Sequence, residues 1–143
     1  MNKATFRYIV TDVDQEVAFY TSHLGFNVDK NFVLAMAILQ REDLQFWIAG
    51  PKASASRPMP DGAQPAPGSW NRIVIPFEDL AEAVGKLRDA GATFRNEIET
   101  GPGGSQMLCE DPSGNCIERF QPARRLKELE RIRGLTYLKP TCR

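Results

Sequence analysis

The stretch TFRYIVTDVDQEVAFYTSHLGF, residues 5–26, decides the fold, because its hydrophobic period changes at Asp12. Before Asp12 the side chains alternate between two faces, which predicts a half-buried strand. After it, apolar side chains recur at spacings of three and four, which predicts a helix capped by Asp12 or Asp14 and ended by Gly25. The two faces of the predicted strand are Phe6, Tyr8 and Val10 against Thr5, Arg7 and Ile9, and the predicted helical stripe is Val17, Tyr20 and Leu24.

The same order of elements returns in the second half of the chain. Three strands are predicted after the first helix, within FNV, NFVLAMAILQ and LQFWIAG. Beyond residue 69 come an alternating strand in NRIVIPF, a helix capped by Asp79 and ended by Gly91, and strands in TFRNEIE, SQMLCE and CIERFQ. Because Asp12 aligns with Asp79 and Gly25 with Gly91, we interpret the chain as two strand–helix–three-strand modules.

These modules predict an α+β fold. Each helix covers one face of its sheet, and two modules bury their remaining faces by facing each other, which predicts a curved, eight-stranded, barrel-like cavity. A short C-terminal helix is predicted over Arg124–Arg133, with Leu126, Leu129 and Ile132 on its apolar stripe. The predicted organisation is a first βαβββ module (1–49), a Pro- and Gly-rich linker (50–69), a second βαβββ module (70–122), and a C-terminal helix and tail (123–143), within one structural domain.

Composition excludes several classes of function. The chain has 143 residues with 18 Lys or Arg and 18 Asp or Glu, so its net charge is zero and we expect no nucleic-acid partner. The longest uncharged apolar run, residues 32–39, is far shorter than a membrane span, and the first residues lack a signal-peptide core. Three cysteines without CxxC spacing favour free thiols, and the single His23 excludes motifs that need two histidines. We therefore expect a cytoplasmic protein.

Three stretches resemble a known family: DVDQEVAFYTSHLGF, EDLAEAVGKLRDAGA and DPSGNCIERF. They are similar to the vicinal oxygen chelate superfamily of glyoxalase I, fosfomycin-resistance proteins, extradiol dioxygenases and bleomycin-resistance proteins. The resemblance covers about residues 4–121. In the metal-dependent members it implies ligands on the first strand of each module and on the last strand, where the corresponding residue is Glu118.

At the other implied ligand positions this chain carries different chemistry. Thr5 stands where a His or Glu is usual, and Arg72 stands at the matching position of the second module. A guanidinium cannot ligate a cation, and a threonine hydroxyl is a weak replacement for imidazole. The last strand of the first module offers Gln45 or Trp47 and no carboxylate. We therefore expect no metal and no other cofactor.

The resulting hypothesis is a metal-free protein of the bleomycin-resistance type that binds an aromatic or anionic small molecule, with drug sequestration and antibiotic resistance as its role. The predicted ligand-binding residues are Thr5, Trp47, Trp70, Arg72, Met107 and Glu118. Arg72 either contacts the ligand or pairs with Glu118.

The alternative is an enzyme of the same fold, a lyase, isomerase or dioxygenase, that uses Glu118 as metal ligand or general base. A partner-binding module is a third class, and the resemblance also implies a homodimer, with intrachain or swapped pairing of the modules.

Overall fold

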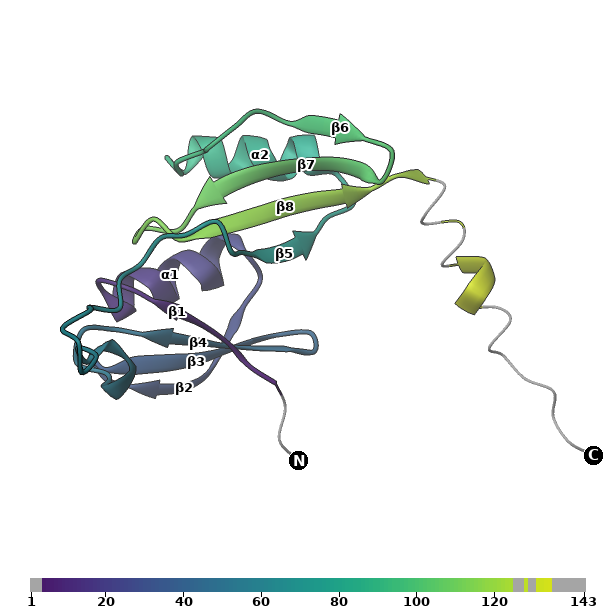
Figure 1. Ribbon diagram of the computed structural model, residues 1–143. Helices are drawn as coiled ribbons and strands as arrows, with labels where there is room; N and C mark the ends of the chain where they lie inside the picture. Colours follow the sequence, from purple (N-terminus) through teal and green to yellow (C-terminus); the bar gives the residue numbers. More distant parts are fainter. Residues whose placement is uncertain (1–3, 125–127, 129–130, 135–143) are drawn as a thin grey trace, which may run out of the picture. The chain divides into compact units, whose positions relative to one another are not determined.

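The computed structural model describes residues 4–124, 128 and 131–134 (Figure 1). Its elements in chain order are β1 (Phe6–Ile9), α1 (Val13–His23), β2 (Asn27–Phe32), β3 (Met36–Arg41), β4 (Leu44–Ala49), the 3-10 turn η1 (Ser54–Ser56), β5 (Ile73–Pro76), α2 (Leu80–Asp89), β6 (Glu99–Gly101), β7 (Gly104–Glu110) and β8 (Cys116–Pro122). No helix in this part of the chain is long and apolar enough to cross a membrane.

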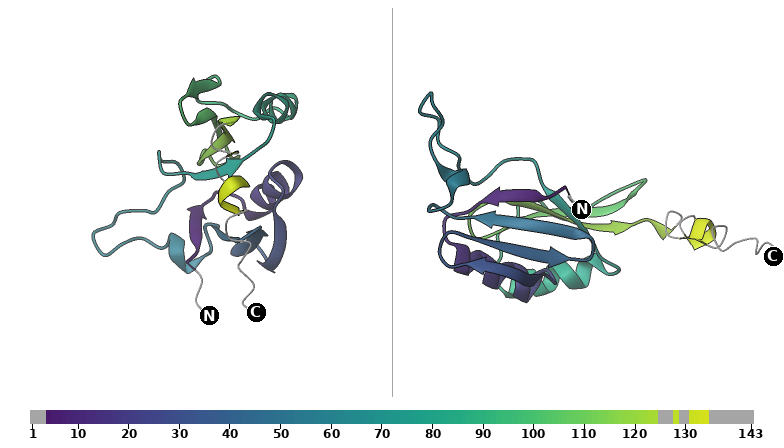
Figure 2. Two further views of the ribbon diagram at one scale, coloured as in Figure 1. Left: turned by 90° about the vertical axis from the view of Figure 1, so that its right-hand side faces the viewer. Right: turned by 90° about the horizontal axis from the view of Figure 1, so that it is seen from below.

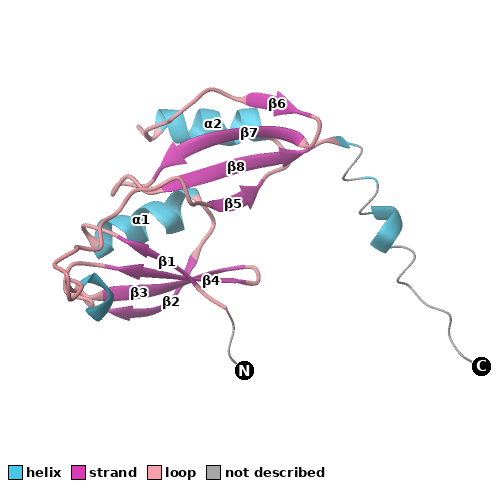
Figure 3. Cartoon of the chain, viewed as in Figure 1, coloured by secondary structure: helices cyan, strands magenta, loops and turns pink. Residues whose placement is uncertain are grey.

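The strands form two four-stranded sheets, which confirms the predicted α+β fold of two βαβββ modules (Figure 3). The first sheet has the order β1-β4-β3-β2 and the second the order β5-β8-β7-β6. The eight strands therefore do not close into one eight-stranded barrel, because each sheet ends at its own edge strands. A cavity shared by the modules stays a prediction.

The chain divides into two compact units. The first runs to Arg72 and also includes Glu110–Ile117, and the second comprises Ile73–Cys109 and the chain from Glu118. The loop DPSGN, residues 111–115, thus belongs with the first unit although it connects β7 to β8 of the second sheet. Hydrogen bonds within the first unit explain this placement, since Asn115 Nδ2 donates to the Ile9 carbonyl oxygen at 2.9 Å.

Helix α1 begins where the sequence predicts and covers one face of the first sheet (Figure 2). The Asp12 side chain accepts a hydrogen bond from the Gln15 N–H at 3.0 Å, and Gly25 has a φ of 71° after the helix. The buried stripe differs from the predicted one, because Val17 is only half-buried. The buried side chains of the stripe are Val13, Glu16, Tyr20 and Leu24.

The first sheet has a face covered by α1 and an open face. The parallel pair of β1 and β4 places Arg7 opposite Trp47, and the antiparallel pair of β3 and β4 places Ile38 opposite Trp47. Because side chains alternate along a strand, the two faces follow from this register. The covered face holds Tyr8, Ala37, Leu39, Phe46 and Ile48, all buried. The open face of β1, β3 and β4 holds Arg7, Ile9, Met36, Ile38, Gln40, Gln45, Trp47 and Ala49.

Two strand predictions were wrong in extent. The predicted strand NFVLAMAILQ, residues 31–40, is not one strand, because the Ala35 N–H donates to the Phe32 carbonyl oxygen and Leu34 has a φ of 66°, which makes a turn between β2 and β3. The predicted strand TFRNEIE is reduced to β6, which starts at Glu99, and an isolated bridge between Phe94 and Cys109.

Helix α2 matches its prediction. The Asp79 side chain accepts a hydrogen bond from the Glu82 N–H at 3.0 Å, and Gly91 has a φ of 80°. The predicted stripe of Leu80, Val84 and Leu87 is buried. Of the predicted C-terminal helix, Arg124, Glu128 and residues 131–134 are helical and Ile132 is exposed, whereas Leu126 and Leu129 lie outside the described residues.

Replacing Gly104 by alanine is expected to destabilise the second unit by about 3 kcal/mol. Gly104 has a φ of 143°, and an added Cβ would overlap the Gln121 carbonyl oxygen of β8. Denaturant unfolding measures the loss. Gly103→Ala is the matched control, because no heavy atom lies within 4 Å of a Cβ at that position. Equal stability of the two variants would contradict the close approach of β7 and β8.

Candidate functional site

Four side chains form a compact group on the open face of the first sheet: Thr5, Arg7, Gln45 and Trp47. We call them the β1–β4 quartet. The Thr5 hydroxyl donates to Gln45 Oε1 at 3.3 Å, and the Trp47 indole N–H donates to the same oxygen at 3.3 Å. The Arg7 guanidinium lies over the Trp47 ring at 4.9 Å from its centroid. The structure therefore brings together Thr5 and Trp47, two of the predicted site residues.

The quartet is partly open to solvent. Arg7 is exposed, and the other three side chains are half-buried. Next to them on the open face lie two further half-buried apolar side chains, Ile9 and Ile38. An indole at a partly exposed position, with polar groups beside it, is a surface on which a planar molecule can pack.

The donor set of this face does not fit a metal ion. The open face of β1, β3 and β4 carries no His, Cys, Asp or Glu side chain. Thr5 and Gln45 are the oxygen donors nearest the implied ligand positions, and they are hydrogen-bonded to each other. Across the described part of the chain, no group of three or more His, Cys, Asp or Glu residues is placed to hold a metal.

Glu118 lies on the face of the second sheet that is turned away from α2. Its neighbours on β8 point the other way, because the Gln121 side chain accepts a hydrogen bond from the Leu80 N–H of α2 at 2.8 Å, and the Arg119 guanidinium lies 3.6 Å from the Phe77 ring centroid. Alternation then places the Glu118 side chain on the face opposite α2. Its side chain is buried, with 8% of its surface exposed.

Met107 takes a different position from the predicted one. It is fully buried in the core beneath α2, together with Leu80, Val84 and the half-buried Phe94. This is the helix-covered face of the second sheet, so Met107 serves packing there. Its neighbour Gln106 is on the opposite face of β7 and lines a pocket.

Trp70 and Arg72 close the linker at the end of the first unit. Trp70 is 70% exposed, so its indole is a surface group in this structure. Arg72 is half-buried, and its guanidinium donates to the Trp70 carbonyl oxygen at 3.3 Å. The two alternatives for Arg72, a contact with a ligand and a pair with Glu118, both stay predictions.

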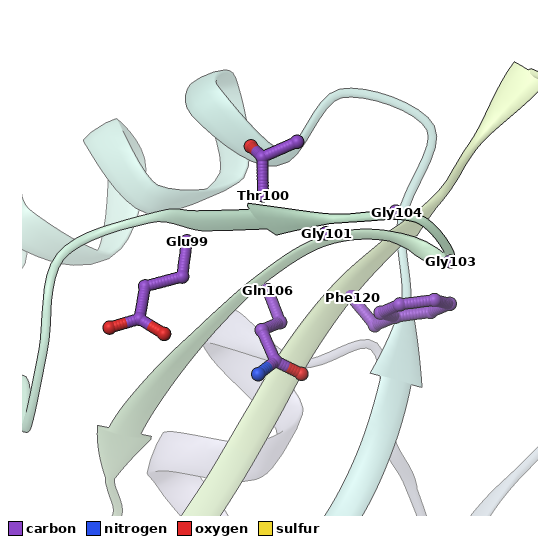
Figure 4. Close-up of a pocket in the computed structure, with 7 residues that line it drawn as sticks. All are labelled: Glu99, Thr100, Gly101, Gly103, Gly104, Gln106 and Phe120. Carbon is purple, nitrogen blue, oxygen red and sulfur yellow. The ribbon is translucent and has the colours of Figure 1, made fainter.

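The second unit has a pocket of about 230 Å³ beside the β6–β7 turn (Figure 4). The side chains of Glu99, Gln106 and Phe120 lie on one side of this hairpin, and Thr100 points to the other side. The pocket is shallow and its lining includes Gly101, Gly103 and Gly104. None of these residues is among the predicted site residues.

A buried acidic cluster ties the loop DPSGN to α1 within the first unit. The Asp111 carboxylate accepts hydrogen bonds from the Tyr20 hydroxyl at 2.9 Å and from Asn115 Nδ2 at 3.0 Å. It also accepts the backbone N–H groups of Ser113 at 3.0 Å and Asn115 at 2.8 Å. The Ser113 hydroxyl donates to the Glu16 carboxylate. Two carboxyl groups therefore share one buried network.

The network changes the acidity of its members. Burial, followed by the charge of Asp111, raises the pKa of Glu16 from 4.5 to about 8. Burial also raises the pKa of Asp111, although hydrogen bonds from Asn115 and Tyr20 work in the opposite direction. Burial raises the pKa of the Tyr20 hydroxyl, which therefore remains a hydrogen-bond donor at neutral pH. One of the two carboxyl groups thus holds a proton near neutral pH.

Sequence reasoning missed the role of Glu16, and a signal for it was present. Glu16 follows Val13 by three positions and precedes Tyr20 by four, so it lies on the same helical stripe as both. A charge on a buried stripe needs a partner, and the DPSGN loop supplies it. The positions of Arg7 beside Trp47 and of Thr5 beside Gln45 depend on the pairing of β1 with β4, which alternation alone does not give.

The chain belongs to the Glyoxalase/Bleomycin resistance protein/Dioxygenase superfamily, whose family model matches residues 4–118. This confirms the resemblance to the vicinal oxygen chelate superfamily. A comparison with curated proteins found no matching sequence.

Solved structures share the fold at low sequence identity. A lactoylglutathione lyase from Agrobacterium tumefaciens is 14% identical with a TM-score of 0.66, covering 88% of this chain and 96% of that one. The fosfomycin resistance protein FosX from Listeria monocytogenes is 13% identical with a TM-score of 0.64, covering 87% and 96%. A virulence protein from Salmonella typhimurium is 22% identical with a TM-score of 0.60, covering 86% and 98%.

Proposed function

We propose that the chain binds a small aromatic or anionic molecule without a metal ion, and that sequestration of such a compound is its role in drug resistance. The observation that carries this proposal is the half-buried Trp47 on the open face of the first sheet, with Arg7 over its ring and Gln45 on its indole N–H. A partly exposed indole flanked by fixed polar groups supplies both contact area and orientation for a planar ligand.

The proposed ligand contacts rest on different amounts of support. Thr5 and Trp47 belong to one hydrogen-bonded group and carry the proposal. Trp70, Arg72 and Glu118 remain predictions. Met107 is no longer proposed, because it packs beneath α2. A homodimer and a cytoplasmic location also remain predictions, and the binding proposal depends on neither.

An enzyme of the same fold is the alternative, as a lyase, isomerase or dioxygenase. The observation that favours it is the burial of Glu118 on the face of the second sheet turned away from α2, where a carboxylate acting as general base or metal ligand is shielded from water. If the chain turned over a bound compound and Glu118→Gln abolished this turnover, the function would be catalysis and not sequestration.

A thermal-shift screen against natural-product antibiotics, phenols and glutathione adducts tests the binding proposal, because a ligand that binds only the folded chain raises its melting temperature. For a compound that stabilises the chain, Trp47→Leu is expected to weaken binding by about tenfold or more, the effect of losing an aromatic contact. Val33→Ala is the control, because it shortens a 78% exposed apolar side chain of the same unit. Equal binding by the Trp47 variant and the wild type would contradict the proposed site.

A further inference from the structure

The hydrogen bonds of Gln45 fix the orientation of its amide group. An indole N–H can only donate, so the atom of Gln45 that faces Trp47 Nε1 must be the amide oxygen. The Thr5 hydroxyl donates to the same oxygen. The amide nitrogen is therefore turned away from both partners, and among the described residues its two N–H groups have no acceptor.

Arg7 adds a positive charge to the same place. In the described part of the chain, no carboxylate lies within ion-pair distance of its guanidinium, whose recorded contact is the ring of Trp47. Register pairs Arg7 with Trp47, and Thr5 lies two residues before Arg7 as Gln45 lies two before Trp47. Neighbouring strands are about 4.8 Å apart and residues two apart on one strand about 7 Å, so one small molecule can reach both Arg7 and Gln45.

The quartet thus presents donors and a positive charge, with no acidic side chain on the open face of β1, β3 and β4. A ligand that matches it offers acceptors and a negative charge. The guanidinium is planar and the amide offers two N–H groups, so both suit a group with two coplanar oxygens. The half-buried indole of Trp47 and the adjacent Ile38 favour a flat apolar body attached to that group.

We propose that the β1–β4 quartet is a binding site for aromatic carboxylates, in which Arg7 and the Gln45 amide nitrogen bind the carboxylate and Trp47 contacts the ring. This inference rests on the proposed small-molecule function and names the ligand class of that site. In this site Gln45 determines specificity. Its amide nitrogen donates to an acceptor of the ligand, whereas a glutamate at the same position would repel an anionic ligand.

The test uses 1-naphthoate as probe, with neutral 1-naphthamide and 1-naphthylphosphonate as comparison compounds. Trp70→Phe leaves Trp47 as the single indole, because the chain has two tryptophans, so quenching of fluorescence then reports on the quartet. We expect 1-naphthoate to quench Trp47 and to bind about tenfold or more tightly than 1-naphthamide, because a charge-assisted contact is lost with the amide. Tighter binding of the phosphonate would assign the site to phosphonates and overturn the carboxylate preference.

Gln45→Glu is the decisive variant. A glutamate keeps an oxygen for the Thr5 and Trp47 donors but places negative charge where the amide nitrogen stood, so we expect the loss of 1-naphthoate binding by about tenfold or more with the fold retained. Arg7→Gln is expected to weaken binding to a similar extent. Gln15→Glu on α1 is the matched control, because it makes the same change of charge at an exposed position. Circular dichroism and thermal unfolding establish that each variant is folded.

The outcomes separate this inference from the proposed function. Unchanged 1-naphthoate binding in folded Gln45→Glu, or equal affinity for naphthoate and naphthamide, overturns the carboxylate site and leaves small-molecule binding in place. Binding of neutral planar compounds with no binding of naphthoate has the same consequence. Failure of every compound in the screen and of all three naphthyl probes overturns both proposals.

Discussion

Replacing Asp111 by alanine is expected to lower the free energy of unfolding by about 4 kcal/mol. The Asp111 carboxylate accepts four hydrogen bonds, from Tyr20, from the Ser113 N–H, and from the N–H and side chain of Asn115. Alanine leaves these donors without their acceptor in a buried position, which costs about 1–3 kcal/mol per group before relaxation. Relief of the repulsion between Asp111 and Glu16 offsets only part of the loss.

Urea unfolding followed by circular dichroism measures this effect. Tyr20→Phe is the graded comparison, because it removes one of the four hydrogen bonds and keeps the aromatic ring against Phe26 and Phe46. We expect it to cost about 1–2 kcal/mol. Pro112→Ala is the neighbouring control at an exposed position of the same loop. If Asp111→Ala were as stable as Tyr20→Phe, Asp111 would not be the centre of the network.

Stability is expected to fall as the pH rises from about 5 to about 8, owing to Glu16. Its pKa is 4.5 in the unfolded chain and about 8 in the folded one, so the folded state binds the proton more tightly. The contribution of this proton to stability is fully present below pH 4.5 and is lost as the pH approaches the folded-state pKa. The largest slope is about 1.4 kcal/mol per pH unit. The raised pKa of Asp111 acts in the same direction.

Glu16→Gln is expected to flatten this pH dependence and to be more stable than the wild type at pH 8, by about 2 kcal/mol. Glutamine keeps an oxygen for the Ser113 hydroxyl and carries no charge to place beside Asp111. Urea unfolding at several pH values compares the two proteins. Glu42→Gln, on an exposed turn of the same unit, should leave the pH dependence unchanged. A wild type whose stability rises over this range would contradict the raised pKa of Glu16.

Sequence patterns predicted the helix ends correctly, because the interactions that form them involve residues close together in the sequence. Asp12 and Asp79 cap their helices because short carboxylates satisfy the first free N–H groups, and Gly25 and Gly91 adopt the left-handed conformation that follows a helix end. The stripe of α1 was misassigned at Val17, because the pattern of spacings admits two stripes and the buried one contains a glutamate. That choice depends on a partner 95 residues away in sequence, Asp111, whose charge couples to Glu16.

The candidate site was predicted only in part, because some of its contacts also depend on residues far apart in the sequence. Strand alternation separated Arg7 and Ile9 from Phe6 and Tyr8, and the register of β1 with β4 confirms these two faces. The prediction that Met107 contacts the ligand was wrong. The face that Met107 takes depends on where β7 starts after the turn at Gly101–Gly104, which composition does not define. The contacts of Gln45 depend on the parallel pairing of β1 with β4, a relation between segments about 40 residues apart.

Calorimetry on the same protein before and after dialysis against EDTA measures whether the chain binds a small molecule without a metal. The ligand is the most stabilising compound of the thermal-shift screen, and elemental analysis accompanies both titrations. We expect one binding site per chain, an unchanged Kd after dialysis, and metal well below one equivalent in the native protein. Metal-free binding would be contradicted if the native protein held near one equivalent of metal, if removal of the metal abolished binding, and if Glu118→Ala held no metal.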